Sequence, residues 1–335
     1  MLAVMKALIS VFVSALAASS HAQTVADGPD PVAALSPCSP NPPGAILGQG
    51  VTTGPEHGTL IAIGGGRLTP EVIGLFIDAA GGIDAPIVYV PTAHAGDLSQ
   101  RDDEAYGVVR TLRARGCTDI TVVHTRDRGV ADTDAFVAPI ARATGVWFSG
   151  GWQWRFVDAY LGTRACVAFH GVLERGGVIA GSSAGATIQA SYLVRGAPEG
   201  NQIMMAEGHE QGFGFLENAA IDQHLFRRGR ETHMIPVVER FEHLLGIGLD
   251  ESAAIVVRHE TLRVLDGANV AIYNHARMTD EHPYLLLEPG DEYDLRKREK
   301  INPTDPGEGE GGPSASAGFP PFPDFNAKHT KIAKR

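Results

Sequence analysis

The chain has 335 residues, of which 44% are hydrophobic and 20% charged, and its formal net charge is −11. A chain of this size can bury one large core, and one domain of about 230 residues flanked by tails fits the composition best. The negative charge argues against a surface that binds nucleic acid or an anionic membrane, because both of these partners are polyanions.

The first 22 residues have the pattern of an export signal. Lys6 precedes an apolar stretch over 7–18, and Ser20-His21-Ala22 has the small-x-small form of a signal-peptidase site. The apolar stretch is too short to span a bilayer, so a cleaved signal is favoured over an uncleaved anchor or a buried helix. We expect cleavage before Gln23, a periplasmic or secreted mature protein, and no membrane attachment afterwards.

The three cysteines, Cys38, Cys117 and Cys166, allow at most one internal disulfide and leave one thiol over. Export would permit such a bridge, since disulfides persist in oxidising compartments. The cysteine spacing does not resemble a metal site, and we expect no metal.

Residues 23–56 are rich in Pro, Gly and Ser and are typical of a loosely attached N-terminal extension. Strands and helices then alternate, which predicts an α/β fold with a doubly wound, mostly parallel sheet and right-handed crossovers. The pattern predicts strands at 59–63, 86–91, 120–124, 146–148 and 178–180, and helices at 69–80, 105–115, 135–143 and 156–175. The glycine turn at 64–66 lacks a G-x-G-x-x-G pattern and a Walker lysine, which argues against a dinucleotide site.

The C-terminal part is predicted to hold a helix over 230–245 and shorter strands at 253–257, 261–265 and 270–273. Asp266-Gly267 is a hairpin signal between the last two strands. We place the folded domain at 57–298 and expect a disordered tail over 299–335, because that stretch is rich in Gly, Pro and Glu.

The chain is organised around the segment 176–186, which reads as a strand, a sharp turn and a helix. The turn has the form G-x-S-x-G, an elbow that holds a serine in strained geometry between glycines. Ser183 is therefore the candidate nucleophile. The alternative is a crossover turn made of small residues.

A serine nucleophile needs a base and a group that orients it. His224 is the candidate base because the segment 221–230, Ile-Asp-Gln-His-Leu-Phe-Arg-Arg-Gly-Arg, places it between an acid and a cluster of arginines. Arg228 and Arg230 suit the recognition of carboxylates. The alternative is a charged loop.

Four motifs occur in order: FSGGWQ at 148–153, GGVIAGSSAGA at 176–186, IDQHLFRRGR at 221–230 and GIGLDE at 246–251. Together they resemble the S51 serine peptidases, a family that includes the cyanophycinases and the aspartyl dipeptidase peptidase E. The resemblance runs from about Leu60 to Tyr273. It implies a fold similar to class I glutamine amidotransferases, with serine in place of their cysteine, and no cofactor.

The resemblance also implies the site residues. Ser183 would be the nucleophile, His224 the base and Glu199 the acid, with Glu207 and Glu210 as alternatives. The remaining expected residues are the oxyanion donors Ala184 and Gly151, through their backbone N–H groups, and the substrate-binding residues Gln153, Asp222, Gln223, Arg228 and Arg230. The chain departs from the cyanophycinase pattern at Trp152, where that pattern has Asp, and at His233, where it has Arg.

We therefore expect an exported serine peptidase that cleaves β-aspartyl isopeptide bonds in cyanophycin or related aspartyl and arginyl peptides. An aspartyl dipeptidase or small-peptide amidase of the same family is the alternative among enzymes, and a non-catalytic periplasmic binding protein is the alternative outside them. A homodimer is compatible with the sequence.

Overall fold

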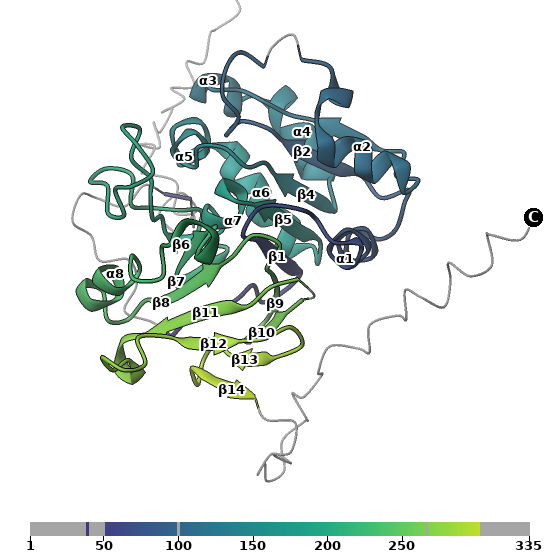
Figure 1. Ribbon diagram of the computed structural model, residues 1–335. Helices are drawn as coiled ribbons and strands as arrows, with labels where there is room; N and C mark the ends of the chain where they lie inside the picture. Colours follow the sequence, from purple (N-terminus) through teal and green to yellow (C-terminus); the bar gives the residue numbers. More distant parts are fainter. Residues whose placement is uncertain (1–37, 40–50, 99–100, 266, 302–335) are drawn as a thin grey trace, which may run out of the picture. The chain divides into compact units, whose positions relative to one another are not determined.

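The computed structural model describes residues 38–39, 51–98, 101–265 and 267–301 (Figure 1). The predicted export signal and its cleavage site, most of the predicted N-terminal extension, and the tail beyond residue 301 lie outside the described residues. In the part of the chain that is described, no helix is long and apolar enough to cross a membrane.

The main sheet has nine strands in the order β14-β13-β10-β9-β1-β5-β4-β2-β3. Its parallel half, β1, β5, β4, β2 and β3, comprises Thr59–Ile63, Val178–Ser182, Gly145–Phe148, Ile87–Val90 and Ile120–Val122. Its antiparallel half, β9, β10, β13 and β14, comprises Ala254–Arg258, Thr261–Val264, Glu292–Asp294 and Glu299–Ile301.

The second sheet has five strands in the order β12-β11-β8-β7-β6. In that order the strands are Leu285–Leu287, Val270–Asn274, Leu245–Leu249, Leu216–Gln223 and Ala190–Tyr192. β6, β7 and β8 run parallel, whereas β11 pairs antiparallel with both of its neighbours.

The α-helices α1 to α8 are Pro70–Ala80, Gly107–Ala114, Arg128–Ala131, Asp134–Arg142, Trp154–Tyr160, Arg164–Glu174, Ala184–Thr187 and Ile235–Arg240. Short 3₁₀ turns lie at Asp103–Ala105, Phe226–Arg228 and His275–Arg277. Thr69 caps α1 by accepting a hydrogen bond from the Val72 N–H, and Pro70 occupies the first turn, as the Thr-Pro start predicts.

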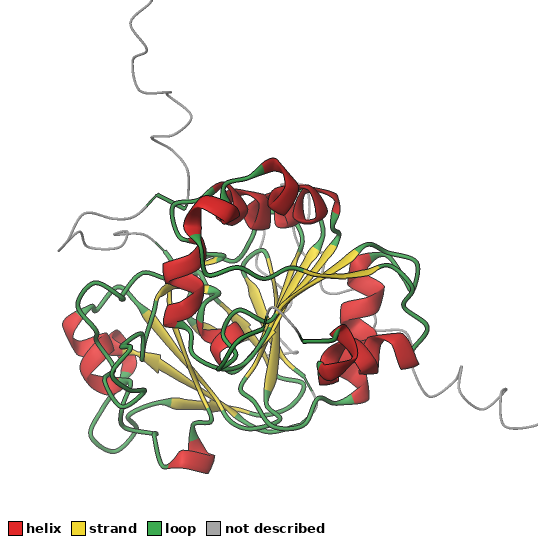
Figure 2. Ribbon diagram, turned by 90° about the horizontal axis from the view of Figure 1, so that it is seen from above, coloured by secondary structure: helices red, strands yellow, loops and turns green. Residues whose placement is uncertain are grey.

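Helices lie on both faces of the parallel half of the main sheet (Figure 2). Along β1, Ile61 and Ile63 pack in one apolar cluster with α1 and α2, while Leu60 and Ala62 pack in another with α4, α5 and α6. Side chains of a strand alternate between its faces, so a strand buried on both faces must be apolar throughout. This arrangement confirms the predicted doubly wound α/β fold.

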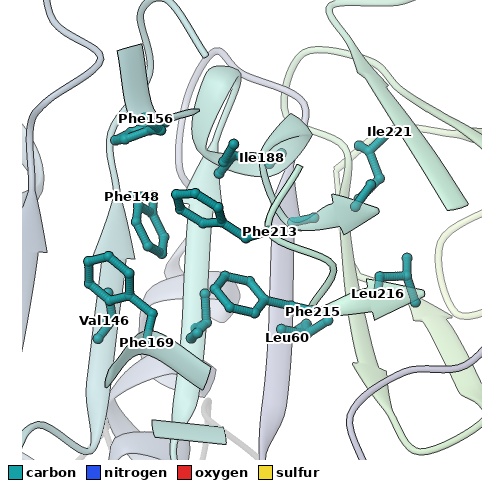
Figure 3. Packing of buried hydrophobic residues seen from close by; sticks show 14 of the residues in the cluster. Leu60, Val146, Phe148, Phe156, Phe169, Ile188, Phe213, Phe215, Leu216 and Ile221 are labelled. Atoms are coloured by element: carbon teal, nitrogen blue, oxygen red, sulfur yellow. The ribbon is translucent and has the colours of Figure 1, made fainter. Parts of the chain in front are cut away.

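Aromatic rings fill the second of these clusters (Figure 3). The ring of Phe148 on β4 lies 4.9 Å from that of Phe169, 5.8 Å from that of Phe213 and 6.2 Å from that of Phe215. Because this cluster also contains residues of β7 and β8, such as Ile221 and Ile247, it joins the two sheets in one core. The second sheet also packs on α7, the helix that follows β5.

Three predicted elements differ from the structure. The helix expected over 230–245 is limited to α8, since Leu245 already pairs in β8. The two strands expected to form a hairpin do not pair with each other, because β10 pairs with β9 and β13 whereas β11 pairs with β8 and β12. β14, which lies in the predicted tail, pairs with β13, so the folded domain extends beyond its predicted end at 298.

A disulfide attaches part of the predicted N-terminal extension to the domain. Cys38 and Cys166 on α6 are bonded, and Cys117 is a buried free thiol. Thr53 forms an antiparallel bridge with Glu217 on β7. One of the pairings that the sequence left open is therefore formed.

Candidate active site

Ser183 lies in a strained turn between β5 and α7. Its backbone has φ 56° and ψ −113°, an unusual conformation for a residue with a side chain, and its N–H donates to the Ile63 carbonyl at 2.8 Å. A Cβ atom on Gly181 would lie 2.1 Å from the Gly185 carbonyl oxygen, and one on Gly185 would lie 2.2 Å from the Phe148 oxygen. The glycines of G-x-S-x-G are therefore required by close backbone contacts, as the motif predicts.

His224 follows the end of β7 and faces the serine. The Nε2 atom of its ring lies 3.0 Å from Ser183 Oγ, and its backbone N–H donates to the Gly64 carbonyl. A Cβ on Gly65 would lie 2.2 Å from His224 Cε1. The glycine turn after β1 therefore gives the imidazole room to reach the serine.

The carboxylate that contacts His224 belongs to Glu251. Its Oε1 atom lies 3.0 Å from His224 Nδ1. The expected acid, Glu199, is exposed in the segment after β6 and, among the described residues, forms no hydrogen bond or ion pair with His224. Glu210 accepts a hydrogen bond from Tyr192. Glu251, and not the expected Glu199, is therefore the carboxylate in position to orient His224.

Two backbone N–H groups remain candidates for an oxyanion hole. Ala184 is the first residue of α7, and the N–H groups of a first helical turn have no partner within the helix. Gly151 has φ 135°, and a Cβ there would lie 2.1 Å from the Ala93 oxygen. The turn lies next to the nucleophile, because a Cβ on neighbouring Gly150 would be 3.4 Å from Ser183 Cβ. The roles expected for Ala184 and Gly151 stay a prediction.

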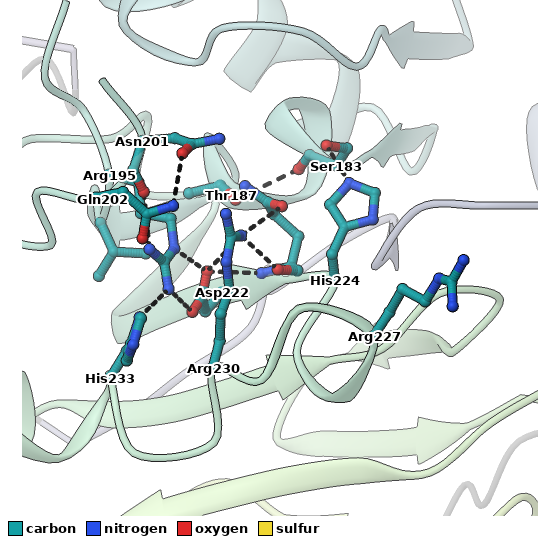
Figure 4. Close-up of polar contacts among 12 residues, drawn as sticks. Ser183, Thr187, Arg195, Asn201, Gln202, Asp222, His224, Arg227, Arg230 and His233 are labelled. Carbon is teal, nitrogen blue, oxygen red and sulfur yellow. Dashed lines mark hydrogen bonds and ion pairs between the residues drawn. The ribbon is translucent and has the colours of Figure 1, made fainter. Parts of the chain in front are cut away.

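A buried cluster of charges lies beside the serine and the histidine (Figure 4). Arg195 donates through Nε and Nη2 to both carboxylate oxygens of Asp222, at 2.7 and 2.8 Å. Arg230 Nη1 lies 4.0 Å from Asp222 and donates to the carbonyl oxygen and to Oε1 of Gln223. All three charged side chains are buried, so two cations share one anion.

This excess of positive charge contributes to a lowered pKa of Arg230. Burial, and then the charge of Arg195, lower that pKa to about 10, so the guanidinium stays protonated at neutral pH. A ligand carboxylate would relieve the repulsion between the two cations. Asp222, Gln223 and Arg230 are thus brought together as expected, whereas Arg195 was not predicted.

The other expected substrate-binding residues have different surroundings. Gln153 is buried, and its Nε2 donates to the carbonyls of Val194 and Arg195, so this amide group fixes the segment after β6. Arg228 is exposed. His233 accepts a hydrogen bond from Arg195 Nη2 through Nδ1, at 3.0 Å.

Burial lowers the pKa of His224 below its usual value, and the charge of Arg228 lowers it further. The hydrogen bond from Nδ1 to Glu251 acts in the opposite direction but does not outweigh these effects. At neutral pH the imidazole is therefore uncharged, and the bond to Glu251 leaves Nε2 free to accept the proton of Ser183.

The chain is similar to known proteins over most of its length. Residues 60–265 match the family model described as Peptidase family S51. A cyanophycinase from Synechococcus elongatus is 28% identical over 271 residues, which cover 72% of this chain and 80% of the relative. A cyanophycinase from Geminocystis herdmanii is 24% identical over 251 residues, covering 69% of this chain and 90% of the relative.

A solved structure resembles the fold. The crystal structure of a peptidase from an acI-B1 actinobacterium superposes with a TM-score of 0.54 at 22% identity, covering 73% of this chain and 98% of the other. At this identity the likeness concerns the fold alone.

Proposed function

Because the chain belongs to peptidase family S51, a family of serine peptidases, we propose that Ser183, His224 and Glu251 hydrolyse β-aspartyl isopeptide bonds through an acyl-enzyme. One observation carries the proposal: Ser183 Oγ, His224 Nε2, His224 Nδ1 and Glu251 Oε1 form a continuous line with two 3.0 Å contacts. A nucleophile, a base and an orienting acid in hydrogen-bond reach are what such catalysis requires.

In the proposed reaction, His224 Nε2 takes the proton of Ser183 as Oγ attacks the carbonyl carbon. The resulting oxyanion would accept hydrogen bonds from the N–H groups of Ala184 and Gly151. The imidazolium, stabilised by Glu251, then protonates the leaving amine as the amide bond breaks. Water attacks the acyl-enzyme with His224 again as the base, which releases the acid product and restores the serine.

The proposed substrate is cyanophycin, a poly-aspartate that carries arginine on each β-carboxyl group. Two curated relatives of this chain are cyanophycinases. The positive excess of Arg195 and Arg230 over Asp222 further supports a substrate with a free carboxylate, such as that of the attached arginine.

We also propose that the protein is exported. The Cys38–Cys166 disulfide supports this, because such bonds persist in oxidising compartments. N-terminal sequencing of periplasmic or secreted material should begin near Gln23. An intact Met1 on cytoplasmic protein would refute export.

Labelling tests the nucleophile. A fluorophosphonate should form an adduct on Ser183 of the folded protein and none on the Ser183→Ala variant, whereas the neighbouring Ser182→Ala variant should still be labelled.

A parallel assay of released amine defines the substrate. The substrates compared are insoluble cyanophycin, β-aspartyl-arginine and α-aspartyl dipeptides. Failure to label Ser183 would favour a binding protein, and turnover of α-aspartyl dipeptides alone would favour a dipeptidase.

A further inference from the structure

Three arginines converge on one residue of the loop that follows β2. Arg126 and Arg155 both donate to the carbonyl oxygen of His94. Arg101 Nη1 lies 3.3 Å from Nδ1 of the same histidine. We call Arg101, Arg126 and Arg155 the arginine cluster.

The positive charge of the arginine cluster is not balanced by ion pairs. Among the ion pairs between described residues, which extend to 4.0 Å, none involves Arg101, Arg126 or Arg155. Two nearby carboxylates carry charge: Asp97 acts on His124, and Asp103 acts on Tyr106, whose ring centroid lies 5.7 Å from the guanidinium carbon of Arg101. Burial and the charge of Arg126 lower the pKa of Arg155, in keeping with uncompensated repulsion. Two anions near three cations, of which Asp103 already lies 4.0 Å from Arg113, leave room for a ligand anion.

The arginine cluster lies on the side of Ser183 away from His224. Neighbouring strands of the main sheet follow the order β1-β5-β4-β2-β3. His224 packs on the glycine turn after β1, Ser183 follows β5, and His94 and Arg126 follow β2 and β3. The carboxyl ends of these parallel strands therefore present the base, the nucleophile and the cluster in that order.

Backbone contacts connect the cluster to the nucleophile. Gly150 adjoins Ser183, and the Trp152 N–H donates to the Ala93 carbonyl at 2.9 Å. Arg155 also donates to that carbonyl. Strands are spaced about 4.8 Å apart, so the ends of β2 and β5, which have β4 between them, lie roughly 10 Å apart. His94 and Ser183 follow these two ends.

We propose that the arginine cluster binds a carboxylate of the peptide substrate about three residues from the bond that is cleaved. An extended chain advances about 3.3 Å per residue, so three residues span roughly 10 Å. Guanidinium groups pair with carboxylates through two parallel hydrogen bonds, and Arg101 and Arg126 are exposed to solvent. The site thereby favours an acidic oligomer over a dipeptide. This inference rests on the proposed function.

A purely structural role would have a different consequence. If the three arginines only hold the loop at His94 beside the oxyanion turn, their loss would lower turnover of short and long substrates equally. If they bind a distant carboxylate, the loss falls selectively on the longer substrate. The ratio of the two kcat/KM values therefore separates these roles.

Binding can be measured without catalysis. In a Ser183→Ala background, fluorescein-labelled hexa-aspartate is titrated by fluorescence anisotropy. The Arg101→Gln/Arg126→Gln double variant should bind at least about tenfold more weakly than its parent, with a shallower dependence on salt. The matched control is Arg142→Gln, an exposed arginine on α4 that is ion-paired with Asp119, and its affinity should equal that of the parent. Equal affinities for the double variant and the parent would overturn the proposal.

Kinetics complete the test in the Ser183 protein. In the double variant, the ratio of kcat/KM for a soluble oligomer to kcat/KM for β-aspartyl-arginine should fall about tenfold. The fall should come from a higher KM for the oligomer. Arg126→Lys, which keeps the charge, should recover part of the ratio. Equal losses on both substrates would assign the arginines to loop positioning and overturn the proposal. Binding of hexa-aspartate by a protein that hydrolyses neither substrate would instead refute the proposed function alone.

Discussion

His224 Nδ1 and Glu251 Oε1 lie 3.0 Å apart although the two residues are separated by 27 positions in the chain. Parallel pairing explains their proximity, because Gln223 at the end of β7 lies opposite Leu249 at the end of β8. The residues that leave these two strands therefore emerge at one edge of the second sheet. A Cβ on Gly64 would collide with the Asp250 carbonyl at 2.1 Å, so the turn after β1 packs closely against this edge.

Replacing Glu251 should impair catalysis much more than replacing Glu199. Glu251→Gln removes the charge that stabilises the imidazolium of His224, and we expect kcat to fall by about 10² to 10⁴-fold. Glu199→Gln alters an exposed carboxylate and should leave kcat within about twofold. The measurement is steady-state kinetics on the substrate identified above, and a larger loss for Glu199→Gln would reverse this assignment.

Much of the fold follows from local patterns. Strands of the parallel half are short apolar runs between turn signals, and both the Thr-Pro start and the glycine end of α1 act locally. The second sheet could not be predicted in this way. Whether β10 and β11 pair with each other depends on long-range packing, since a turn signal between two strands does not determine whether they belong to the same sheet.

The site divides along the same line. Ser183 and His224 lie in sequence motifs that indicate their chemical roles. The acid can be identified only once it is known which strands pair, because strand pairing brings Glu251 next to His224. Glu251 ends the segment 246–251 that carried part of the family resemblance, and the pairing of β7 with β8 would have identified it. Arg195 carried no signal, because a buried arginine in an otherwise apolar segment is recognised only through its partner Asp222.

The pH dependence should reflect the lowered pKa of His224. Because burial and Arg228 disfavour the imidazolium, the base stays unprotonated to lower pH than an ordinary histidine. The acid limb of kcat/KM should therefore have its midpoint below pH 6.5, the usual pKa of histidine. A midpoint above pH 6.5 would contradict the lowered pKa.

Removing the charge of Arg228 should move that limb. Arg228→Gln relieves repulsion of the imidazolium, so the pKa of His224 should rise and activity should be lost at higher pH than in the parent. Arg227→Gln is the matched control, because Arg227 is exposed on the same turn and does not contribute to the shift. A shift of equal size in both variants would point to the overall charge of the turn.

The disulfide should contribute measurably to stability. Cys38→Ser/Cys166→Ser opens a covalent link across 128 positions, and we expect the free energy of unfolding to fall by about 2–4 kcal/mol. Denaturant unfolding measures the loss, with Cys117→Ala as a control that removes the buried free thiol. In the parent, thiol titration after unfolding without reductant should find one reactive cysteine, and three would refute the bond.

Restoring the arginine of the cyanophycinase pattern at position 233 should destabilise the protein. His233 Nδ1 accepts a hydrogen bond from Arg195 Nη2, so His233→Arg would place a third guanidinium beside two cations that already share the single charge of Asp222. We expect a loss of about 1–3 kcal/mol in the free energy of unfolding, and no gain in turnover of cyanophycin. His233→Gln, whose Oε1 can accept the same hydrogen bond, is the matched control and should lose less. Higher turnover by His233→Arg with an unchanged melting temperature would show that the pocket accommodates a third arginine.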